Sequence, residues 1–179
     1  MLQRMRKGFS SLATTLAPVL VAGCVLVWPD EARAGSKLAL DLDFAHGIDE
    51  TGIKAGTGGV LRFGQELDLV GVSLTPELGI SYHTFSGALD ASHYSAMVGA
   101  RFGFGAALRP SVFGHVGIGR LDLEVGGDTG ATFDVGIALD LVVLPILDIG
   151  IHGAYDVLLT EGDGNFDWLR AGAHVALGF

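Results

Sequence analysis

Four charged residues could form ion pairs on one face of a sheet. In each of their segments the charged side chain falls on one face and the apolar side chains fall on the other. The four residues occur in four successive segments of alternating apolar and polar residues and are Asp41, Arg62, Glu77 and Arg101. Strand side chains alternate with a period of two, so charges in this pattern share a face. Opposite charges on neighbouring strands attract one another. In a narrow interior they would act either as a gate for solutes or as a structural polar plug, which is the interpretation we favour.

Histidines on the same face could add metal ligands to these charges. His152 and His174 would be neighbours, with His115 close by. Zinc requires three or four converging ligands, and the spacing of these residues does not single out such a set. We therefore predict polar interior histidines whose protonation at about pH 6 changes the interior charge, with no metal site and no cofactor. The complete predicted charge network comprises Asp41, Arg62, Glu77, Arg101, Asp140, Asp148, His152, Asp156, Arg170 and His174.

Three short motifs look like catalytic or ion-binding sequences, but each is incomplete. Residues 128–130 (Asp-Thr-Gly) match the tripeptide of aspartic proteases, which need two such carboxylates, and the single copy here predicts a hairpin turn. Residues 93–95 (His-Tyr-Ser) resemble the His-x-Ser of outer-membrane lipid A deacylases, without their following Asn or a convincing acid partner. Residues 163–168 begin like a calcium loop, but Trp168 stands where Gly is required. We therefore predict no catalytic residues and no enzyme activity.

Eight segments of alternating residues would position the charges. The predicted strands cover residues 37–45, 58–69, 72–85, 93–105, 111–124, 131–143, 147–159 and 168–179. Four long or polar connections alternate with three tight ones, as in a barrel whose two sets of connections lie at opposite ends. The long ones are 46–57, 86–92, 125–130 and 160–167. Eight is about the smallest number of strands that closes into a barrel with a filled interior.

The face opposite the charges is apolar in nearly every segment. A soluble β-sandwich has the same period, so the period alone does not distinguish the two. The outward aromatic residues favour a membrane barrel, because they form two groups near opposite strand ends, as interfacial girdles do. The predicted girdles are Phe44, Tyr82, Tyr94, Phe133 and Tyr155 at the outer end and Phe102, Phe104 and Phe179 at the other. The fifth segment fits least well, since it turns Arg120 outward; either snorkelling to lipid headgroups or a β-bulge would accommodate it.

The first 34 residues have the parts of a secretory signal peptide. A basic start precedes an apolar stretch over residues 12–27, and an A-x-A cleavage site follows at Ala32 and Ala34. The alternative is a lipoprotein box ending in Cys24, which would then carry a lipid. Removing residues 1–34 leaves 7 basic and 18 acidic residues, a net charge of −11, and no cysteine. Such a chain forms no disulfides and lacks the basic surface that nucleic-acid binding needs.

The last segment carries a family resemblance. Residues 168–179 end on Phe179 with apolar side chains at alternate positions before it, which resembles the C-terminal signal of bacterial outer-membrane barrels. Residues 35–179 as a whole resemble the small outer-membrane barrel families of Gram-negative bacteria, OmpA-, OmpX- and OmpW-like in the broad sense. The resemblance implies an all-β, eight-stranded antiparallel up-and-down barrel in the outer membrane. It also implies contact with membrane lipid and lipopolysaccharide, and recognition of the C-terminal strand by the barrel-assembly machinery.

Together these features predict a non-enzymatic outer-membrane barrel with an envelope-structural role and a largely plugged lumen. One alternative is a narrow passive pore, or an OmpW-like channel for small or apolar solutes, which needs an open path past Arg62 and Arg101. Another is a lipid-modifying enzyme, which needs a His, a Ser and an acid on the lipid-facing side.

Overall fold

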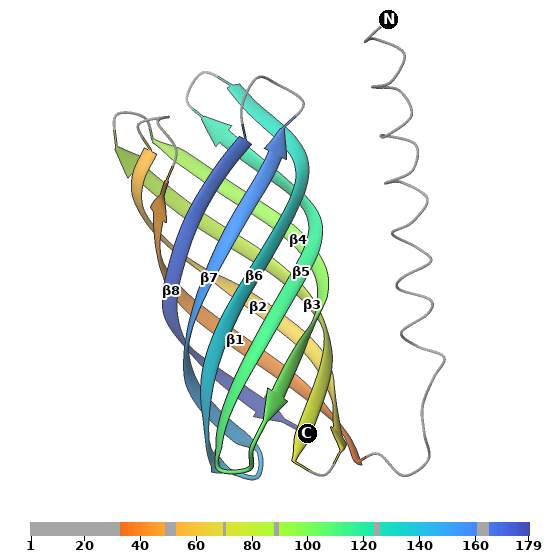
Figure 1. Cartoon of the computed structure of the whole chain (residues 1–179). Coiled ribbons are helices and arrows are strands. Elements are labelled where there is room, and N and C mark those ends of the chain that lie inside the picture. Colours follow the sequence, from red (N-terminus) through yellow and green to blue (C-terminus); the bar gives the residue numbers. More distant parts are fainter. Residues whose placement is uncertain (1–32, 49–52, 70, 88–89, 124–125, 161–164) are drawn as a thin grey trace, which may run out of the picture. The chain divides into compact units, whose positions relative to one another are not determined.

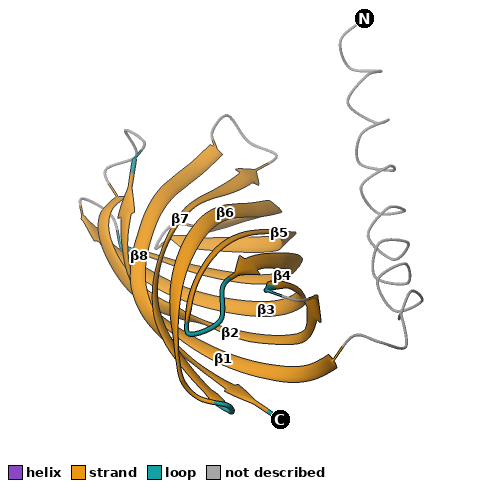
Figure 2. Ribbon diagram, turned by 60° about the horizontal axis from the view of Figure 1, so that its bottom comes forward, coloured by secondary structure: helices purple, strands orange, loops and turns teal. Residues whose placement is uncertain are grey.

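The residues that the structure describes fold into a single closed sheet. The computed structural model describes residues 33–48, 53–69, 71–87, 90–123, 126–160 and 165–179. Its strands are β1 (Arg33–Gly47), β2 (Ile53–Leu69), β3 (Val72–Gly87), β4 (Ala91–Phe104), β5 (Leu108–Leu123), β6 (Gly126–Leu144), β7 (Leu147–Thr160) and β8 (Asn165–Gly178). Each strand pairs antiparallel with the next, and β1 pairs with β8 to close the barrel (Figures 1 and 2). The predicted fold class is therefore confirmed.

The two ends of the barrel differ in their connections. β1, β3, β5 and β7 finish, and β2, β4, β6 and β8 begin, at one end of the barrel, which we call the loop end (Figure 1). The tight turns lie at the other end, the turn end, where β1 starts and β8 finishes. The predicted signal peptide and Cys24 lie outside the described residues, apart from Arg33 and Ala34, which begin β1.

The strands reach further toward the loop end than the alternation of residues predicted. β2 begins at Ile53 instead of residue 58, and β6 begins at Gly126 instead of residue 131. Gly126 still pairs with Leu123 of β5, because ladder hydrogen bonds join backbone groups and need no alternation of side chains. The predicted loops over 46–57 and 125–130 are therefore shorter than expected, and the predicted hairpin turn at 128–130 is wrong, since these residues belong to β6.

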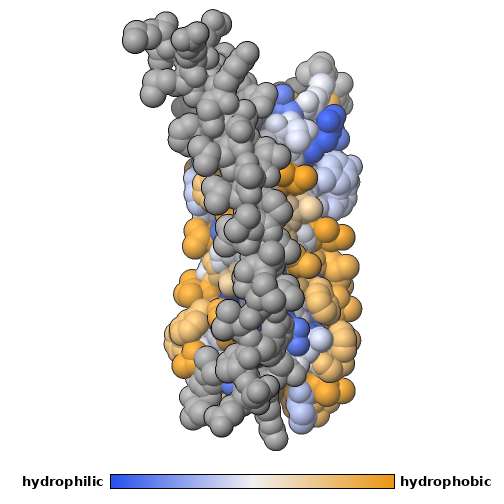
Figure 3. Space-filling model, turned by 90° about the vertical axis from the view of Figure 1, so that its right-hand side faces the viewer, coloured by the Kyte–Doolittle hydropathy of each residue, from blue (hydrophilic) through white to orange (hydrophobic). Residues whose placement is uncertain are grey.

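The outer surface is apolar along the middle of the strands. Ile118 and Ile137 are 68% and 66% exposed, and similar side chains project from every strand. On the face shown in Figure 3, apolar residues cover most of the visible barrel surface, and hydrophilic ones gather toward one end. All eight predicted girdle aromatics point outward, and Tyr82 and Tyr94 lie side by side with ring centroids 4.9 Å apart. Within the described residues, no helix is long and apolar enough to cross a membrane.

The fifth strand is regular. Its pairing with β4 and with β6 runs without a register shift, so a bulge does not explain its outward arginine. Arg120 lies on the outer surface and donates from Nε to Oδ1 of Asp122 at 2.6 Å. The inward residues of this strand include Phe113 and Leu121, both buried, as the alternation predicted.

Apolar side chains fill the interior at the loop end. This group, which we call the loop-end cluster, consists of Ala45, Phe85, Ala91, Leu121, Leu158, Phe166 and Trp168. Phe166 stacks on Trp168 with ring centroids 5.1 Å apart, and Phe85 meets Phe166 edge to face. Trp168 is 1% exposed and Leu158 is fully buried. The interior is therefore apolar near the loop end and charged over the rest of its length.

Candidate functional site: the lumen charge network

Arg62 lies at the centre of the charged part of the lumen. Its Nε and Nη2 donate to the two carboxylate oxygens of Asp41 at 2.9 and 2.7 Å, and its Nη1 donates to Oε1 of Glu77 at 2.9 Å. Asp41 and Glu77 lie on the strands to either side of Arg62, each displaced two residues from the position directly opposite it. Gly79 stands directly opposite Arg62, and its Cα lies beside the arginine stem, where a Cβ would come within 3.5 Å of Cγ of Arg62.

Glu77 joins Arg62 to two further basic side chains. Its Oε1 also accepts from Nε of Arg101 at 3.3 Å, and its Oε2 contacts Nε2 of His115 at 3.1 Å. Arg101 lies over the ring of Phe113 with its guanidinium carbon 4.8 Å from the ring centroid, a favourable cation–π arrangement. The Arg101 side chain is thereby held between the carboxylate of Glu77 on β3 and the ring of Phe113 on β5.

Arg170 is the hub of the network nearer the loop end. It donates to Asp156 and to Asp134 at 2.8 Å each, and its Nη1 lies 3.5 Å from Oδ2 of Asp43. The arginine is 4% exposed, and all three carboxylates are buried. Asp134 also accepts from Nδ1 of His115 at 2.7 Å. The Arg170 hub and the Arg62–Glu77 group therefore form one connected network.

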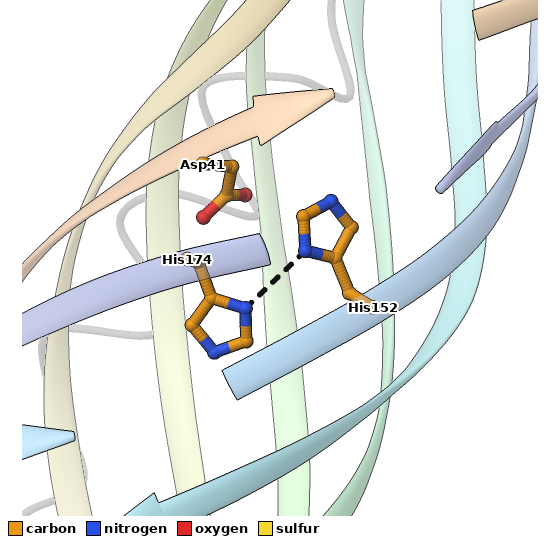
Figure 4. Close-up of side chains that lie close together, drawn as sticks. All are labelled: Asp41, His152 and His174. Carbon is orange, nitrogen blue, oxygen red and sulfur yellow. Dashed lines mark hydrogen bonds between the residues drawn. The ribbon is translucent and has the colours of Figure 1, made fainter. Parts of the chain in front are cut away.

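Two adjacent histidines connect Asp43 to Asp140. His152 Nε2 lies 2.6 Å from Oδ1 of Asp43, and His174 Nε2 contacts Oδ1 of Asp140. The two Nδ1 atoms face each other at 3.2 Å, as Figure 4 shows. Asp43 additionally contacts Nε2 of His83 at 3.0 Å. The four groups thus form a continuous chain from a carboxylate nearer the loop end to one nearer the turn end.

A third group of charges lies near the turn end. Lys37 donates to Asp148 at 2.6 Å and contacts Glu66 at 2.8 Å, and Arg109 pairs with the same Glu66. The space left between the charged groups is small: a cavity of about 30 Å³ lies among the turn-end residues, and another of about 10 Å³ adjoins Arg62 and Arg170. Since one water molecule needs roughly 10–15 Å³ of such volume, these cavities hold only a few waters.

The structure brings all ten predicted network residues into the lumen. Arg62 meets Asp41 and Glu77, Arg170 meets Asp156, and His152 meets His174. Seven further members are not among the ten residues of the predicted network, although each occupies an inward position in the alternation of its strand, and His115 was predicted only as a nearby interior histidine. They are Lys37, Asp43, Glu66, His83, Arg109, His115 and Asp134. The alternation of inward and outward positions along each strand was the signal that could have identified them.

The His-Tyr-Ser motif lies on the lumen side of β4. His93 is 1% exposed, and Ser95 is buried with its Oγ 2.6 Å from Oγ of Ser81. Asp163 of the calcium-like segment lies outside the described residues, and Asp167 accepts a hydrogen bond from the Tyr155 hydroxyl at 2.8 Å. His93 and Ser95 therefore lie away from the outer face, whereas Asp167, bonded to the outward Tyr155, lies on it.

His93 is a buried polar group that lacks a hydrogen-bond partner among the described residues. Its ring lies 4.8 Å from that of Trp168, in an edge-to-face contact, and neither ring nitrogen is bonded. We expect His93→Phe to raise the free energy of unfolding by about 1 kcal/mol, because an unbonded buried polar group is costly. Denaturant titration of the folded barrel measures this.

His83→Phe is the matched control for His93→Phe. It replaces an equally buried histidine whose Nε2 is bonded to Asp43, and it should lower the free energy of unfolding. Equal losses in the two variants would contradict the assignment of His93 as an unbonded group.

Comparison with known proteins finds similar folds among solved structures. No family model and no curated protein matches the chain. The crystal structure of Neisserial surface protein A is similar at a TM-score of 0.63 and 15% identity, covering 82% of this chain and 99% of that one. Two structures of Ail, the attachment invasion locus protein of Yersinia pestis, match at TM-scores of 0.50 and 0.53, with 12% and 14% identity. Each covers 83% of this chain and 99% of its own. By its fold and its apolar outer face, the chain is an eight-stranded β-barrel of the bacterial outer-membrane type.

Proposed function

We propose that this protein is a non-enzymatic outer-membrane barrel whose lumen is closed by its own side chains and which contributes to envelope structure. The observation that carries the proposal is the ion-paired cross-section at Arg62, which bonds to both Asp41 and Glu77 and is 6% exposed. Paired and hydrogen-bonded charges are the form in which a narrow interior tolerates ions. A solute would have to break these bonds to pass.

Two further layers support a closed lumen. The loop-end cluster fills the interior on one side of the ion pairs, and the group formed by Lys37, Glu66, Arg109 and Asp148 lies on the other. Small barrels of this strand number have interiors that side chains can fill. The remaining lumen cavities of about 30 and 10 Å³ are too small for solutes larger than a few waters.

The placement of the catalytic-like residues supports a non-enzymatic role. A lipid-modifying enzyme needs its nucleophile and base on the side that faces lipid, whereas His93 and Ser95 lie inside the barrel. The outer surface of the described strands consists mainly of aliphatic and aromatic residues, which fit contact with lipid acyl chains.

Single-channel recording in planar bilayers tests the proposal. We expect no steady openings from the folded wild-type barrel. Asp41→Ala with Arg62→Ala removes one acid and one base together, and leaves Glu77 its bonds to Arg101 and His115. This charge-balanced double variant should show brief openings more often than the wild type, because it removes the side chains that cross the centre of the lumen, while the loop-end cluster and the turn-end charges still limit steady conduction.

Arg120→Ala is the control for the recordings, since Arg120 lies on the outer surface and its loss should leave the lumen closed. Steady openings from the wild type would overturn the closed-lumen proposal and favour a passive pore.

A further inference from the structure

We propose that Asp41, His152 and His174 form a site for a divalent transition-metal ion of the zinc class, inside the barrel wall at its closing seam. One ligand atom from each residue lies within 4.8 Å of the others, and all three residues are buried. They come from β1, β7 and β8, and their side chains converge on one point (Figure 4). The proposal is independent of whether the lumen conducts.

The spacing of the two histidine nitrogens matches a metal site. Zinc binds imidazole nitrogen at about 2.0–2.1 Å in tetrahedral geometry, which places two such nitrogens about 3.3 Å apart. The Nδ1 atoms of His152 and His174 are 3.2 Å apart. An ion bound to both nitrogens would keep this separation, with each ring turned so that its Nδ1 faces the ion.

The carboxylates beside the two rings are placed as metal ligation requires. Nε2 of His152 faces Asp43, and Nε2 of His174 faces Asp140. An ionised carboxylate only accepts hydrogen bonds, so each Nε2 is placed to donate to its carboxylate. The two Nδ1 atoms are then the nitrogens left either to share a proton, as in the hydrogen bond between them, or to bind a metal ion in its place. Pairing of a ligating histidine's second nitrogen with a carboxylate is the usual outer shell of zinc sites.

The fold explains why these residues meet. Asp41 stands directly opposite His174 in the β1–β8 ladder. Gly150 stands opposite His174, and Gly172 opposite His152, in the β7–β8 ladder. A side chain at Gly150 would contact both His174 and Asp140. Gly150 therefore leaves the space that the His174 ring occupies, and Gly172 leaves space beside Asp43, the carboxylate bonded to His152.

Asp41 supplies the third ligand. Both of its oxygens now bond to Arg62, but a carboxylate has about four acceptor positions, so one oxygen can turn toward the ion while the other keeps the arginine. The turn would shorten the longest ligand separation by about 1.5 Å to reach tetrahedral spacing. A water molecule would take the fourth position.

Local charge favours a cation at this point. Eight carboxylates take part in the lumen network, and they are opposed by five lysine or arginine side chains and by His115, whose two ring nitrogens both contact carboxylates. A divalent ion would offset the negative charge that these groups leave. The cavity near the turn end is lined by both His174 and Asp140, so there is space for water beside the site.

The consequence is a metal cross-link at the seam where β1 and β8 close the barrel. The β1–β8 pairing is the one that joins strands from opposite ends of the sequence. An ion held by β1, β7 and β8 would stabilise the folded barrel over the unfolded chain, because the unfolded chain has no preformed site.

Cobalt absorption spectroscopy on the barrel folded in lipid vesicles tests the site. We expect one Co²⁺ per chain, with the visible bands of a four-coordinate ion, and displacement of Co²⁺ by Zn²⁺. His152→Gln and His174→Gln should each weaken binding at least about a hundredfold. Asp140→Asn, which alters only the outer shell, should weaken it about 10–100-fold.

His83→Gln is the matched control. His83 is an equally buried lumen histidine bonded to Asp43 but outside the cluster, so its loss should change Co²⁺ affinity by less than about threefold. Circular dichroism checks that each variant is folded. Absence of Co²⁺ and Zn²⁺ binding by the wild type would overturn the proposal even if a variant failed to fold. Unchanged binding in the folded His152→Gln, His174→Gln double variant would also overturn it.

Discussion

Replacing Arg170 with methionine is expected to lower the free energy of unfolding by about 3–5 kcal/mol, the range seen when one partner of a buried ion pair is removed. Arg170 donates to Asp156 and Asp134 at 2.8 Å each, and its exposed fraction is 4%. Methionine keeps most of the apolar stem, so the loss would come from buried carboxylates left without their cation. Denaturant titration of the barrel in lipid vesicles measures the difference.

Two further variants show whether the charge is responsible. Arg120→Met removes an arginine whose ion pair with Asp122 is exposed, and it should cost no more than about 1 kcal/mol. Adding Asp156→Asn to Arg170→Met should recover part of the loss, because Arg170 is the ion-pair partner of Asp156. A loss in Arg170→Met no larger than that in Arg120→Met would contradict the role of Arg170 as the hub of the lumen.

The alternation of residue types was sufficient to predict the barrel and the contents of its lumen. Every predicted strand overlaps an observed one, because a half-buried sheet requires two unlike faces and the period of two records both. Arg62, Glu77 and Arg101 could be assigned to one face by parity alone. The pattern holds for Asp43 and Asp134 as well, so their omission was a matter of choosing among equivalent inward residues.

The partners of several charges could not be predicted from the alternation of residues. Arg170 on β8 reaches Asp134 on β6, two strands away, and His83 on β3 reaches Asp43 on β1. Such contacts cross the lumen, so they depend on the stagger between strands and on the barrel's radius. Neither quantity is encoded in the alternation of any one segment.

The alternation of residues also did not predict the loop-end cluster. Trp168 begins the predicted last strand, and a tryptophan near a strand end usually indicates an interfacial girdle. In the structure it faces inward against Phe85 and Phe166. Trp168 occupies the same set of alternate positions as the inward Arg170 and His174. An inward aromatic residue indicates an apolar layer only when other strands bring apolar residues to the same height.

The apolar outer face leads to the second large prediction. Replacing Ile151 with arginine should lower the free energy of unfolding in lipid vesicles by about 2–4 kcal/mol, the cost of a basic side chain near the bilayer midplane on a barrel's lipid face. Ile151 is 62% exposed in the middle of β7, between Leu139 and Ala173 on the neighbouring strands. If water surrounded this face instead, the same substitution would cost little, because an exposed arginine is well hydrated.

Leu159→Arg shows whether the cost of the arginine depends on the depth of the residue in the bilayer. Leu159 is also outward-facing, on the same strand, but it lies at the loop end, beyond the girdle residue Tyr155. A basic side chain at the interface costs only about 0–1 kcal/mol, since it can extend to the headgroups. The two substitutions share their charge, strand and face, so a difference between them can come only from depth and the local packing of each site. Equal and small losses would contradict a membrane-spanning position for the middle of β7, whereas a larger loss at Ile151 would place the bilayer between the two aromatic girdles.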